Sequence, residues 1–351
     1  MSKFMNPQLS SLEAYTPGEQ PRDRTYIKLN TNESPYPPSK GVRKAVNRQA
    51  VDDLRLYCDP NATALKEKLA KLYDKKPSQI FVANGSDDIL NFAFLAFGAE
   101  GVLFPEISYG FYEVFANLHH LPYEKIPLQQ DFTIAVKPYC KQNKMVVIAN
   151  PNAPTGIPLS VRKIEKILQE NQENVVLIDE AYVDFGGESC AALVEKYPNL
   201  LCVQTFSKSR SMAGARLGFA IGSEELIADL ETIKYSTNPY NVNALTQAAG
   251  VAALEDNSYY MRNCRKIIKS RFYTRKQLEK LGFTVLPSRT NFLFAKSDKI
   301  GGMELYLRLK EKGILVRHFE KNRICDYNRI TIGSQKDMEA FIEAVKEILG
   351  A

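Results

Sequence analysis

Between residues 65 and 221 the sequence alternates short apolar runs with stretches of helical spacing, and this alternation constrains the fold most. The apolar runs are rich in Val, Ile, Leu and Phe, and they cover Ile80–Ala83, Val102–Phe104, Met145–Ala149, Val175–Ile178, Leu200–Gln204 and Leu217–Ile221. Continuous apolar runs of this length are typical of parallel strands that helices cover on both faces. Helical spacing occurs between them at Ala64–Tyr73, Asp88–Phe97 and Ser160–Gln169. The pattern predicts an α/β layered domain.

The pattern changes after about residue 245. A long helical stretch runs from Ala244 to about Leu281, and a break is predicted near Asp256–Ser258. Strand-like segments come next at Phe283–Leu286, Asn291–Ala295, Ile314–Arg317 and Arg329–Ile332. Helix-like segments lie at Met303–Lys312 and Lys336–Leu349. We therefore expect a smaller α+β domain over 246–351 and a large α/β domain over 36–245. Residues 1–35 are rich in Pro, Gly and polar groups, and we expect an irregular arm that joins the small domain.

Composition limits the classes of function. Of the 351 residues 44% are hydrophobic and 25% charged, as in ordinary globular proteins. The net charge of +6 favours anionic small-molecule substrates, such as phosphates and carboxylates, and is too diffuse to indicate nucleic acid. The chain has no apolar stretch near the length of about 18 residues that a membrane helix needs, and no apolar signal core. We therefore expect a cytoplasmic protein, in which the six cysteines are reduced, buried thiols.

Polar and aromatic residues come after the predicted strands, at the edge where open α/β sheets bind ligands. After the first strand, Gly85 permits a close backbone approach and Ser86 is an N-cap candidate at a helix start. Such a start attracts phosphate, although a plain N-cap explains the residues equally well. The ring of Tyr109, after the second strand, could stack on a flat heterocycle or belong to the core. The rigid turn at 150–156 either aims an amide into a cleft or only reverses the chain.

The next two strands end on charged residues. Asp179, in the run Asp179-Glu-Ala-Tyr182, is costly at the end of a buried strand unless it pairs with a protonated ring nitrogen or caps a helix. Lys208 comes after Thr205-Phe-Ser, and Arg216 comes eight residues later. Desolvation makes a lysine nucleophilic, so Lys208 could form an imine with a carbonyl cofactor, whereas an isolated lysine is usually a surface residue. The planar fork of Arg216 suits a phosphate group.

These motifs occur in one order along the chain: the asparagine-containing turn, Asp-Glu-Ala-Tyr, Ser-Lys, and an arginine eight residues after the lysine. The order resembles the fold type I enzymes that use pyridoxal 5′-phosphate (PLP), and their aminotransferase branch in particular. The resemblance covers essentially the whole chain, and it implies a large domain with a mostly parallel sheet plus a smaller α+β domain. Further segments resemble the histidinol-phosphate aminotransferase family, and these are Leu12–Glu19, Lys28–Pro37, Tyr57–Pro60, Asn84–Asp87, Pro239–Asn243 and Arg329–Gly333.

The resemblance implies a role for each residue at the cofactor. Lys208 is implied as the catalytic residue, which holds PLP as a Schiff base and moves the substrate proton. Asp179 would hold the pyridinium N–H, Tyr182 would hydrogen-bond the ring hydroxylate, and Tyr109 would stack on the ring. The phosphate would lie at Gly85, Ser86, Thr205, Ser207 and Arg216, with Asp87 also at the cofactor.

Two departures from the family pattern bear on the site. Much of the wider superfamily has an Asn directly before the Pro-Thr-Gly turn, aimed at the ring hydroxyl. Here that position is Ala153, so Asn152 is the substitute candidate for cofactor binding. Asp87 is followed by Asp88, where many members of the family carry Glu.

On the substrate side, the resemblance implies that Arg329 binds the carboxylate of glutamate or 2-oxoglutarate. The same arginine would meet the phosphate of histidinol phosphate, together with Tyr15, Asn32 and Tyr36. Tyr57 would reach the cofactor phosphate from the other subunit of a homodimer. The implied reaction is transamination between L-histidinol phosphate and 2-oxoglutarate in histidine biosynthesis, which gives imidazole acetol phosphate and glutamate.

Short motifs leave other functions open. The alternatives are an aromatic or other amino-acid aminotransferase, a threonine-phosphate decarboxylase, and a PLP-fold regulator or binding protein without catalysis. Such regulators usually carry an added DNA-binding domain, and the residues before the first α/β helix lack a helix-turn-helix pattern. The histidines predict no metal site, because the side chains of His119 and His120 point in different directions on a helix or a strand.

Overall fold

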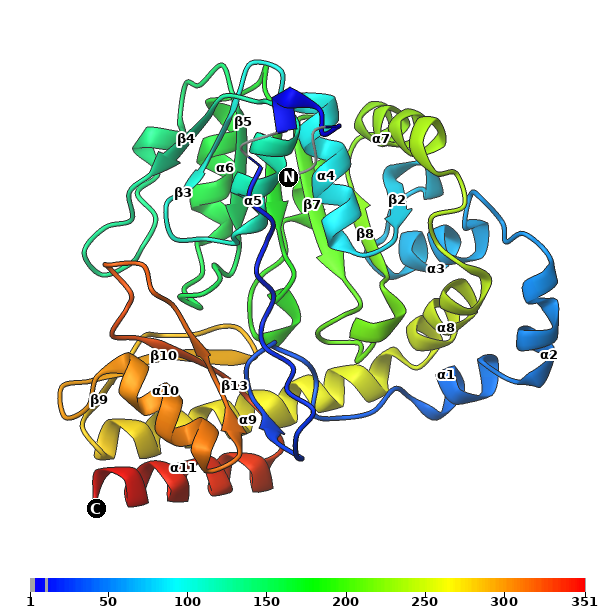
Figure 1. The fold of residues 1–351 in the computed structure, drawn as a ribbon. Helices are drawn as coiled ribbons and strands as arrows, with labels where there is room; N and C mark the ends of the chain where they lie inside the picture. The colour runs from blue at the N-terminus through cyan, green and yellow to red at the C-terminus, as the bar shows by residue number, and fades with distance from the viewer. Residues whose placement is uncertain (1–3, 10–11, 351) are drawn as a thin grey trace.

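Seven strands form a sheet in the order β2-β8-β7-β6-β5-β3-β4 (Figure 1). They are β2 (Ile80–Ala83), β3 (Val102–Pro105), β4 (Tyr123–Ile126), β5 (Met145–Ala149), β6 (Val176–Asp179), β7 (Leu200–Thr205) and β8 (Gly218–Ile221). Strands β4, β3, β5, β6 and β7 are parallel, and β8 runs antiparallel to β7 and β2. The structure, a computed structural model, describes residues 4–9 and 12–350. It confirms the predicted α/β fold with a mostly parallel sheet.

Both faces of this sheet are buried, which explains the continuous apolar runs. Successive side chains of a strand point to opposite faces, and on β5 Val146 and Val147 belong to two separate apolar clusters. The helices of this large unit are α1 (Lys40–Ala45), α2 (Arg48–Asp52), α3 (Thr63–Tyr73), α4 (Ser86–Phe97), α5 (Phe111–Leu118), α6 (Val161–Gln169), α7 (Glu224–Thr237) and α8 (Ala244–Glu255). Strand β4 was not predicted, because it lies at the edge and exposes Glu124 and Lys125.

A second, antiparallel sheet has the order β12-β13-β10-β9. This small unit contains most of α9 (Asn257–Lys280), followed by β9 (Phe283–Val285), β10 (Phe292–Ser297), α10 (Gly302–Glu311), β11 (Ile314–Leu315), β12 (Arg317–His318), β13 (Asn328–Thr331) and α11 (Gln335–Leu349). These helices and antiparallel strands agree with the α+β character that the sequence predicts for this region. Figure 1 shows α9 running beneath the large sheet toward the small one.

The N-terminal arm runs from the large unit to the small unit, where it attaches (Figure 1). Its strand β1 (Ile27–Lys28) pairs in parallel with β11. This pairing ends the predicted strand Ile314–Arg317 early, because β11 pairs with the arm while β12 pairs with β13. Single 3-10 turns complete the chain, and they are η1 (Pro7–Leu9), η2 (Asp53–Arg55), η3 (Pro77–Gln79), η4 (Lys137–Tyr139), η5 (Val183–Phe185), η6 (Ala191–Glu195) and η7 (Ala213–Ala215).

The passage from the large to the small unit lies in α9. The helix α8 packs against α1 and α3, and a Cβ on its Gly250 would touch Leu65 and Leu217 of the large unit. In α9, Tyr260 belongs to an apolar cluster of the large unit, whereas Cys264 belongs to the small-unit cluster. We therefore propose a division near Cys264 instead of at 245/246. A membrane-crossing helix is not found in the described ranges.

Candidate active site

Most residues predicted to bind the cofactor line one cavity of about 440 Å³, which we call the inner cavity. Parallel strands β6 and β7 deliver the residues that come after them to the same edge of the sheet. The predicted residues at this cavity are Ser86, Asp87, Tyr109, Asp179, Tyr182, Thr205, Ser207, Lys208 and Arg216. Cavities of roughly 300–1,000 Å³ are usual for small ligands and cofactors.

The carboxylate of Asp179 is buried at the end of β6. Its Oδ2 accepts a hydrogen bond from the hydroxyl of Tyr112 at 2.8 Å, and its Oδ1 accepts one from the N–H of Ala181 at 3.1 Å. Burial raises the pKa of Asp179 to about 6. A carboxylate has about four acceptor positions, so two bonds leave room for a cationic N–H in the cavity. Tyr112, fully buried on α5, was not predicted; its only sequence signal is its helical spacing from Tyr109.

The amine of Lys208 lies in a desolvated position between the two units. Burial, followed by the nearby Arg329 charge, lowers the pKa of Lys208 to about 8. Its Nζ donates to the backbone carbonyl of Thr31 at 3.2 Å and lies 5.9 Å from the ring centre of Tyr182. An amine with such a pKa is partly neutral near pH 8, and the neutral form is the one that attacks a carbonyl carbon.

The start of α4 lies at one end of the inner cavity. Arg216 Nη2 donates to Asp87 Oδ2 at 2.8 Å, and Asp87 Oδ1 accepts from the Tyr109 hydroxyl at 2.9 Å. Gly85 has φ +92°, which favours glycine, and precedes the free N–H groups of the helix. A Cβ on Gly218 would lie 2.4 Å from the Ser86 nitrogen, so β8 and this helix start are tightly packed. An arginine beside a helix N-terminus suits a phosphate.

The structure does not support Asn152 as a cofactor ligand, and this prediction is corrected. Its Nδ2 donates to the carbonyl of Ile107 and to the hydroxyl of Thr155, both at 3.0 Å. Its Oδ1 accepts from the hydroxyl of Ser108 at 2.9 Å. The amide is therefore occupied in holding the turn, and it is Ala153 that lines the inner cavity.

A second cavity of about 270 Å³, the outer cavity, adjoins the inner one. The two share Thr31, Tyr109, Ala153, Tyr182 and Lys208. The predicted residues Tyr15, Asn32 and Arg329 line the outer cavity, as do three residues that were not predicted, Arg317, Phe319 and Lys321. Arg317 lies at the end of the predicted strand Ile314–Arg317, but a single cation there gives no sign of ligand binding.

Arg329 is a partly buried cation of the outer cavity. Its Nη2 donates to the Asn30 carbonyl at 2.8 Å, and its guanidinium carbon lies 5.4 Å from the ring centre of Phe292. Its Nε is buried and has no hydrogen-bond partner among the residues that the structure describes. Burial lowers the pKa of Arg329, yet an arginine stays charged at neutral pH. A buried charge without a carboxylate partner is a fitting receptor for an anion.

Two other predicted substrate residues line the same cavity. Asn32, with φ +57°, is fixed by its Oδ1, which accepts from the Thr331 hydroxyl at 2.9 Å. Its Nδ2 donates to the hydroxyl of Tyr182, also at 2.9 Å, so it orients a ring that both cavities share. The ring of Tyr15 stacks on Phe111 with centroids 4.2 Å apart.

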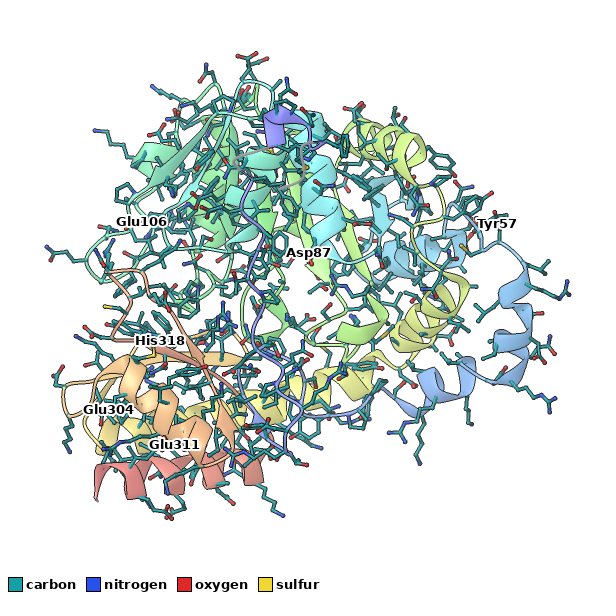
Figure 2. All side chains as sticks on the ribbon, viewed as in Figure 1. Tyr57, Asp87, Glu106, Glu304, Glu311 and His318 are labelled. Atoms are coloured by element: carbon teal, nitrogen blue, oxygen red, sulfur yellow. The ribbon has the colours of Figure 1, made fainter. Side chains whose placement is uncertain are left out.

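Four predicted residues do not line either cavity: Gly85 and Asn152, described above, and Tyr36 and Tyr57. Tyr36 packs against the apolar cluster of the small unit, and its ring centre lies 5.1 Å from Lys266 Nζ, so its predicted contact with substrate is corrected. Tyr57 is 85% exposed and stacks on Tyr240 with centroids 4.6 Å apart. Figure 2 shows Tyr57 at the rim of the molecule, away from Asp87. The predicted role of Tyr57 in a partner subunit stays a prediction.

The inner cavity therefore suits a flat aldehyde with a basic ring nitrogen and a phosphate. It supplies an amine at Lys208, a buried carboxylate at Asp179 and an arginine beside a helix start. Within residues 4–9 and 12–350, no cluster of His, Cys, Asp and Glu has the arrangement of a metal site. The chemistry of the donor set favours an organic cofactor.

Sequence relatives agree with this interpretation. The family model described as aminotransferase class I and II matches residues 24–345. The histidinol-phosphate aminotransferase of Brachyspira hyodysenteriae is 50% identical over 352 residues, which cover 99% of each chain. The protein of the same name from Chromohalobacter salexigens is 49% identical over 350 residues, again 99% of each chain.

Solved structures agree on the fold. The histidinol-phosphate aminotransferase from Sinorhizobium meliloti, solved in complex with pyridoxal-5′-phosphate, has a TM-score of 0.89 at 22% identity, covering 100% of this chain and 98% of that chain. The L-threonine-O-3-phosphate decarboxylase from Porphyromonas gingivalis has a TM-score of 0.82 at 24% identity, covering 93% and 100%. Identities this low show the fold alone, so the sequence relatives decide the family. This chain belongs to the class I and II aminotransferases, within the family of the histidinol-phosphate aminotransferases, as the sequence motifs predicted.

Proposed function

We propose that this chain is a PLP-dependent aminotransferase that exchanges amino and keto groups between L-histidinol phosphate and 2-oxoglutarate. The products are imidazole acetol phosphate and glutamate. One observation carries the proposal: the amine of Lys208 and the carboxylate of Asp179 line the same cavity, and Arg216 lies beside them at the start of α4. The aldehyde, ring nitrogen and phosphate of PLP need these three groups.

Each group has its own task in the reaction. PLP, when bound, withdraws electrons from the substrate carbon that carries the amine. Asp179 keeps the ring nitrogen protonated, because a neighbouring negative charge favours the cationic form. Lys208 holds the cofactor and then takes a proton from the substrate and returns it, a task that needs a pKa near the working pH. We assign the cofactor phosphate to the predicted set Gly85, Ser86, Thr205, Ser207 and Arg216.

The outer cavity supports an anionic substrate. Arg329, Arg317 and Lys321 put positive charge on its wall. Binding an anion compensates the desolvated guanidinium of Arg329, so a phosphate or a carboxylate gains affinity over a neutral group. The same cations serve both half-reactions, because histidinol phosphate carries a phosphate and 2-oxoglutarate carries a distal carboxylate. The names of the closely matching relatives favour histidinol phosphate as the amino donor.

We also propose a homodimer in which Tyr57 completes the inner cavity of the partner. Its ring stacks on Tyr240 yet remains exposed, as expected of an aromatic side chain that packs against a partner subunit. Nearby exposed apolar side chains on the same stretch are Val46, Val51, Leu54 and Leu56. An exposed apolar patch of this kind marks an interaction surface.

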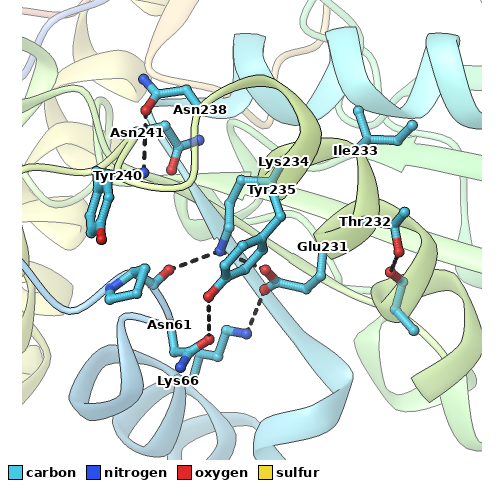
Figure 3. Close-up of polar contacts among 12 residues, drawn as sticks. Asn61, Lys66, Glu231, Thr232, Ile233, Lys234, Tyr235, Asn238, Tyr240 and Asn241 are labelled. Atoms are coloured by element: carbon cyan, nitrogen blue, oxygen red, sulfur yellow. Dashed lines mark hydrogen bonds and ion pairs between the residues drawn. The ribbon is translucent and has the colours of Figure 1, made fainter.

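The segment that comes after Tyr57 has a firm support on α7 (Figure 3). The buried amine of Lys234 donates to the carbonyl of Pro60 at 3.0 Å, and the Tyr235 hydroxyl donates to Asn61 Oδ1 at 2.7 Å. Glu231 balances the charge of Lys234 at 2.5 Å. These contacts fix Pro60 and Asn61, so the neighbouring ring of Tyr57 is held in one position.

The decisive experiment compares amino donors. Purified holoenzyme is mixed with 2-oxoglutarate and histidinol phosphate, phenylalanine or threonine phosphate, and glutamate and carbon dioxide are measured. We expect glutamate formation with histidinol phosphate at the highest kcat/KM. Equal or higher kcat/KM with phenylalanine would remove the assignment to histidine biosynthesis, and carbon dioxide release from threonine phosphate would show a decarboxylase.

A further inference from the structure

The chain between β12 and β13 leaves the small sheet and reaches the large unit. We call residues 319–327 the bridging segment. Its members Phe319, Lys321 and Ile324 line the outer cavity, whose other wall includes Ser108 and Tyr109 of the large unit. Figure 2 shows Glu106, at the lower edge of the large unit, above His318 of β12. The bridging segment therefore closes the cavity wall between the two units.

One side chain fastens the bridging segment to the large unit. Arg323 Nη1 pairs with the carboxylate of Glu106 and donates to the Leu128 carbonyl at 2.8 Å, while its Nη2 donates to the Gln129 carbonyl. The same Oε1 of Glu106 accepts the N–H of Leu128 at 3.1 Å. The guanidinium carbon lies 5.0 Å from the ring centre of Phe132. The arginine thus uses its planar fork on three acceptors and its face on a ring.

Apolar contacts hold the segment on either side of this arginine. Ile324 is buried in an apolar cluster of the large unit. Tyr327 meets Phe132 of the large unit edge-on, with centroids 5.5 Å apart, and stacks on Phe294 of the small sheet at 4.7 Å. An exposed ion pair alone stabilises little, and the Arg323 and Glu106 side chains keep 34% and 31% of their surface exposed. The ion pair therefore acts mainly by fixing the position of the bridging segment.

We propose that Arg323 is a positioning residue for the substrate. Its bonds to Glu106, Leu128 and Gln129 fix the width of the outer cavity, because Glu106 begins the loop that carries Tyr109 and Arg323 belongs to the segment that carries Lys321. Arg323 does not line either cavity. Its removal weakens ground-state and transition-state binding alike, which raises KM and leaves kcat unchanged. The proposal rests on the proposed function only in that substrate enters the outer cavity.

The test is a double-mutant cycle on the holoenzyme. KM and kcat for histidinol phosphate and for 2-oxoglutarate are measured in the unmodified protein, Arg323→Ala, Glu106→Gln and the double variant. We expect Arg323→Ala to raise KM about tenfold for both substrates, because the wall that carries Lys321 is no longer held against the loop of Tyr109, with kcat within about twofold. Glu106→Gln in the Arg323→Ala background should add nothing. Arg323→Lys keeps the charge and loses the planar guanidinium, so its KM should lie between those of the unmodified protein and Arg323→Ala.

Controls separate this proposal from the proposed function. Arg275→Ala removes a comparable exposed pair, with Glu279 on α9, and should leave KM unchanged. If the unmodified enzyme does not turn over histidinol phosphate, the same variants are compared in the glutamate half-reaction, followed by cofactor absorbance. Hydrogen exchange of residues 319–327 should rise in Arg323→Ala. An unchanged KM, additive effects of the two substitutions, or a fall in kcat with an altered cofactor spectrum would overturn the assignment.

Discussion

The inner and the outer cavity meet at Lys208 but are built from different kinds of structure. The inner cavity is lined mostly by residues at or after the ends of the large sheet's strands, with Gln20, Thr31 and Glu33 of the arm beside them, so the order of the sheet places Asp179 and Lys208. The outer cavity is lined by the N-terminal arm, the loop after β3 and the bridging segment. The difference teaches that the reacting groups depend on one sheet, whereas substrate affinity depends on how two units meet. Substitutions in the inner cavity should lower kcat, and those in the outer cavity should raise KM.

The strongest test of this contrast is Lys208→Ala. We expect kcat to fall by more than about 10³-fold, because both the covalent hold on the cofactor and the proton-transferring base are lost. Stopped assays of glutamate formation measure this. Borohydride reduction of the unmodified holoenzyme, followed by peptide mass spectrometry, should find the cofactor on Lys208. Full turnover by the alanine variant would remove this lysine from the mechanism.

Asp179→Asn should lower kcat by about 10²-fold, the usual effect of removing one charged partner from a reacting group. The neutral amide does not hold the ring nitrogen in its protonated form. The matched control is Tyr112→Phe, which removes only the bond from the Tyr112 hydroxyl to Asp179 and should cost less. A rise in KM without a fall in kcat in Asp179→Asn would contradict the contrast between the cavities.

Arg329→Ala should raise KM about 30-fold for histidinol phosphate and for 2-oxoglutarate, because a buried charged contact is lost. Arg329→Lys keeps the charge but not the planar fork, and it should recover part of the affinity. Steady-state kinetics with both substrates measure the effect. A fall in kcat as large as that in Asp179→Asn would show that Arg329 acts on the reacting groups, which would contradict the contrast between the cavities.

The pH dependence of cofactor uptake tests the environment of Lys208, which lines both cavities. The pKa of Lys208 is lowered to about 8, so the neutral amine predominates above that pH and is lost as pH falls below it. Protein stripped of cofactor should therefore take up PLP about tenfold more slowly at about pH 7 than at about pH 9. Arg329→Gln removes one of the causes of the lowered pKa, so the midpoint should move upward. A rate that does not change with pH would show that the amine is not desolvated.

The smallest effect on turnover is expected for Asn152→Ala. This amide serves the turn and not the cofactor, so kcat and the absorbance of bound PLP should change less than about twofold, while the free energy of unfolding falls by about 1–3 kcal/mol. Denaturant unfolding and an absorbance spectrum measure the two quantities. A shifted cofactor spectrum at unchanged stability would restore Asn152 to the cofactor site.

Groups at strand ends could be predicted from the sequence, whereas groups brought together from distant segments could not. The runs before Asp179 and Lys208 predicted strands, and their polar ends had to share one edge. Tyr112 was missed because it reaches Asp179 from a helix 67 residues earlier in the chain. Arg317 was missed because a cation at the end of a predicted strand has no ligand-binding signal of its own, and Lys321 was missed because an irregular segment carries it.

The wrong predictions have a similar cause. Asn152 was chosen because it lies next to Ala153, but a neighbouring residue points elsewhere once the turn uses its amide. Tyr36 lies only four residues after Asn32, yet its ring packs against the small unit. The antiparallel direction of β8 also had no signal, because a buried strand has the same apolar pattern in either direction.

The pairing of β1 with β11 has a mechanical consequence for the reacting lysine. Residues just after β1 are bonded to the small unit, since Thr331 donates its N–H to the Leu29 carbonyl at 2.9 Å and its hydroxyl accepts the Asn32 N–H at 3.0 Å. The Thr31 carbonyl between them is the acceptor for Lys208. A shift of the small unit would therefore move the carbonyl that accepts the hydrogen bond from Lys208.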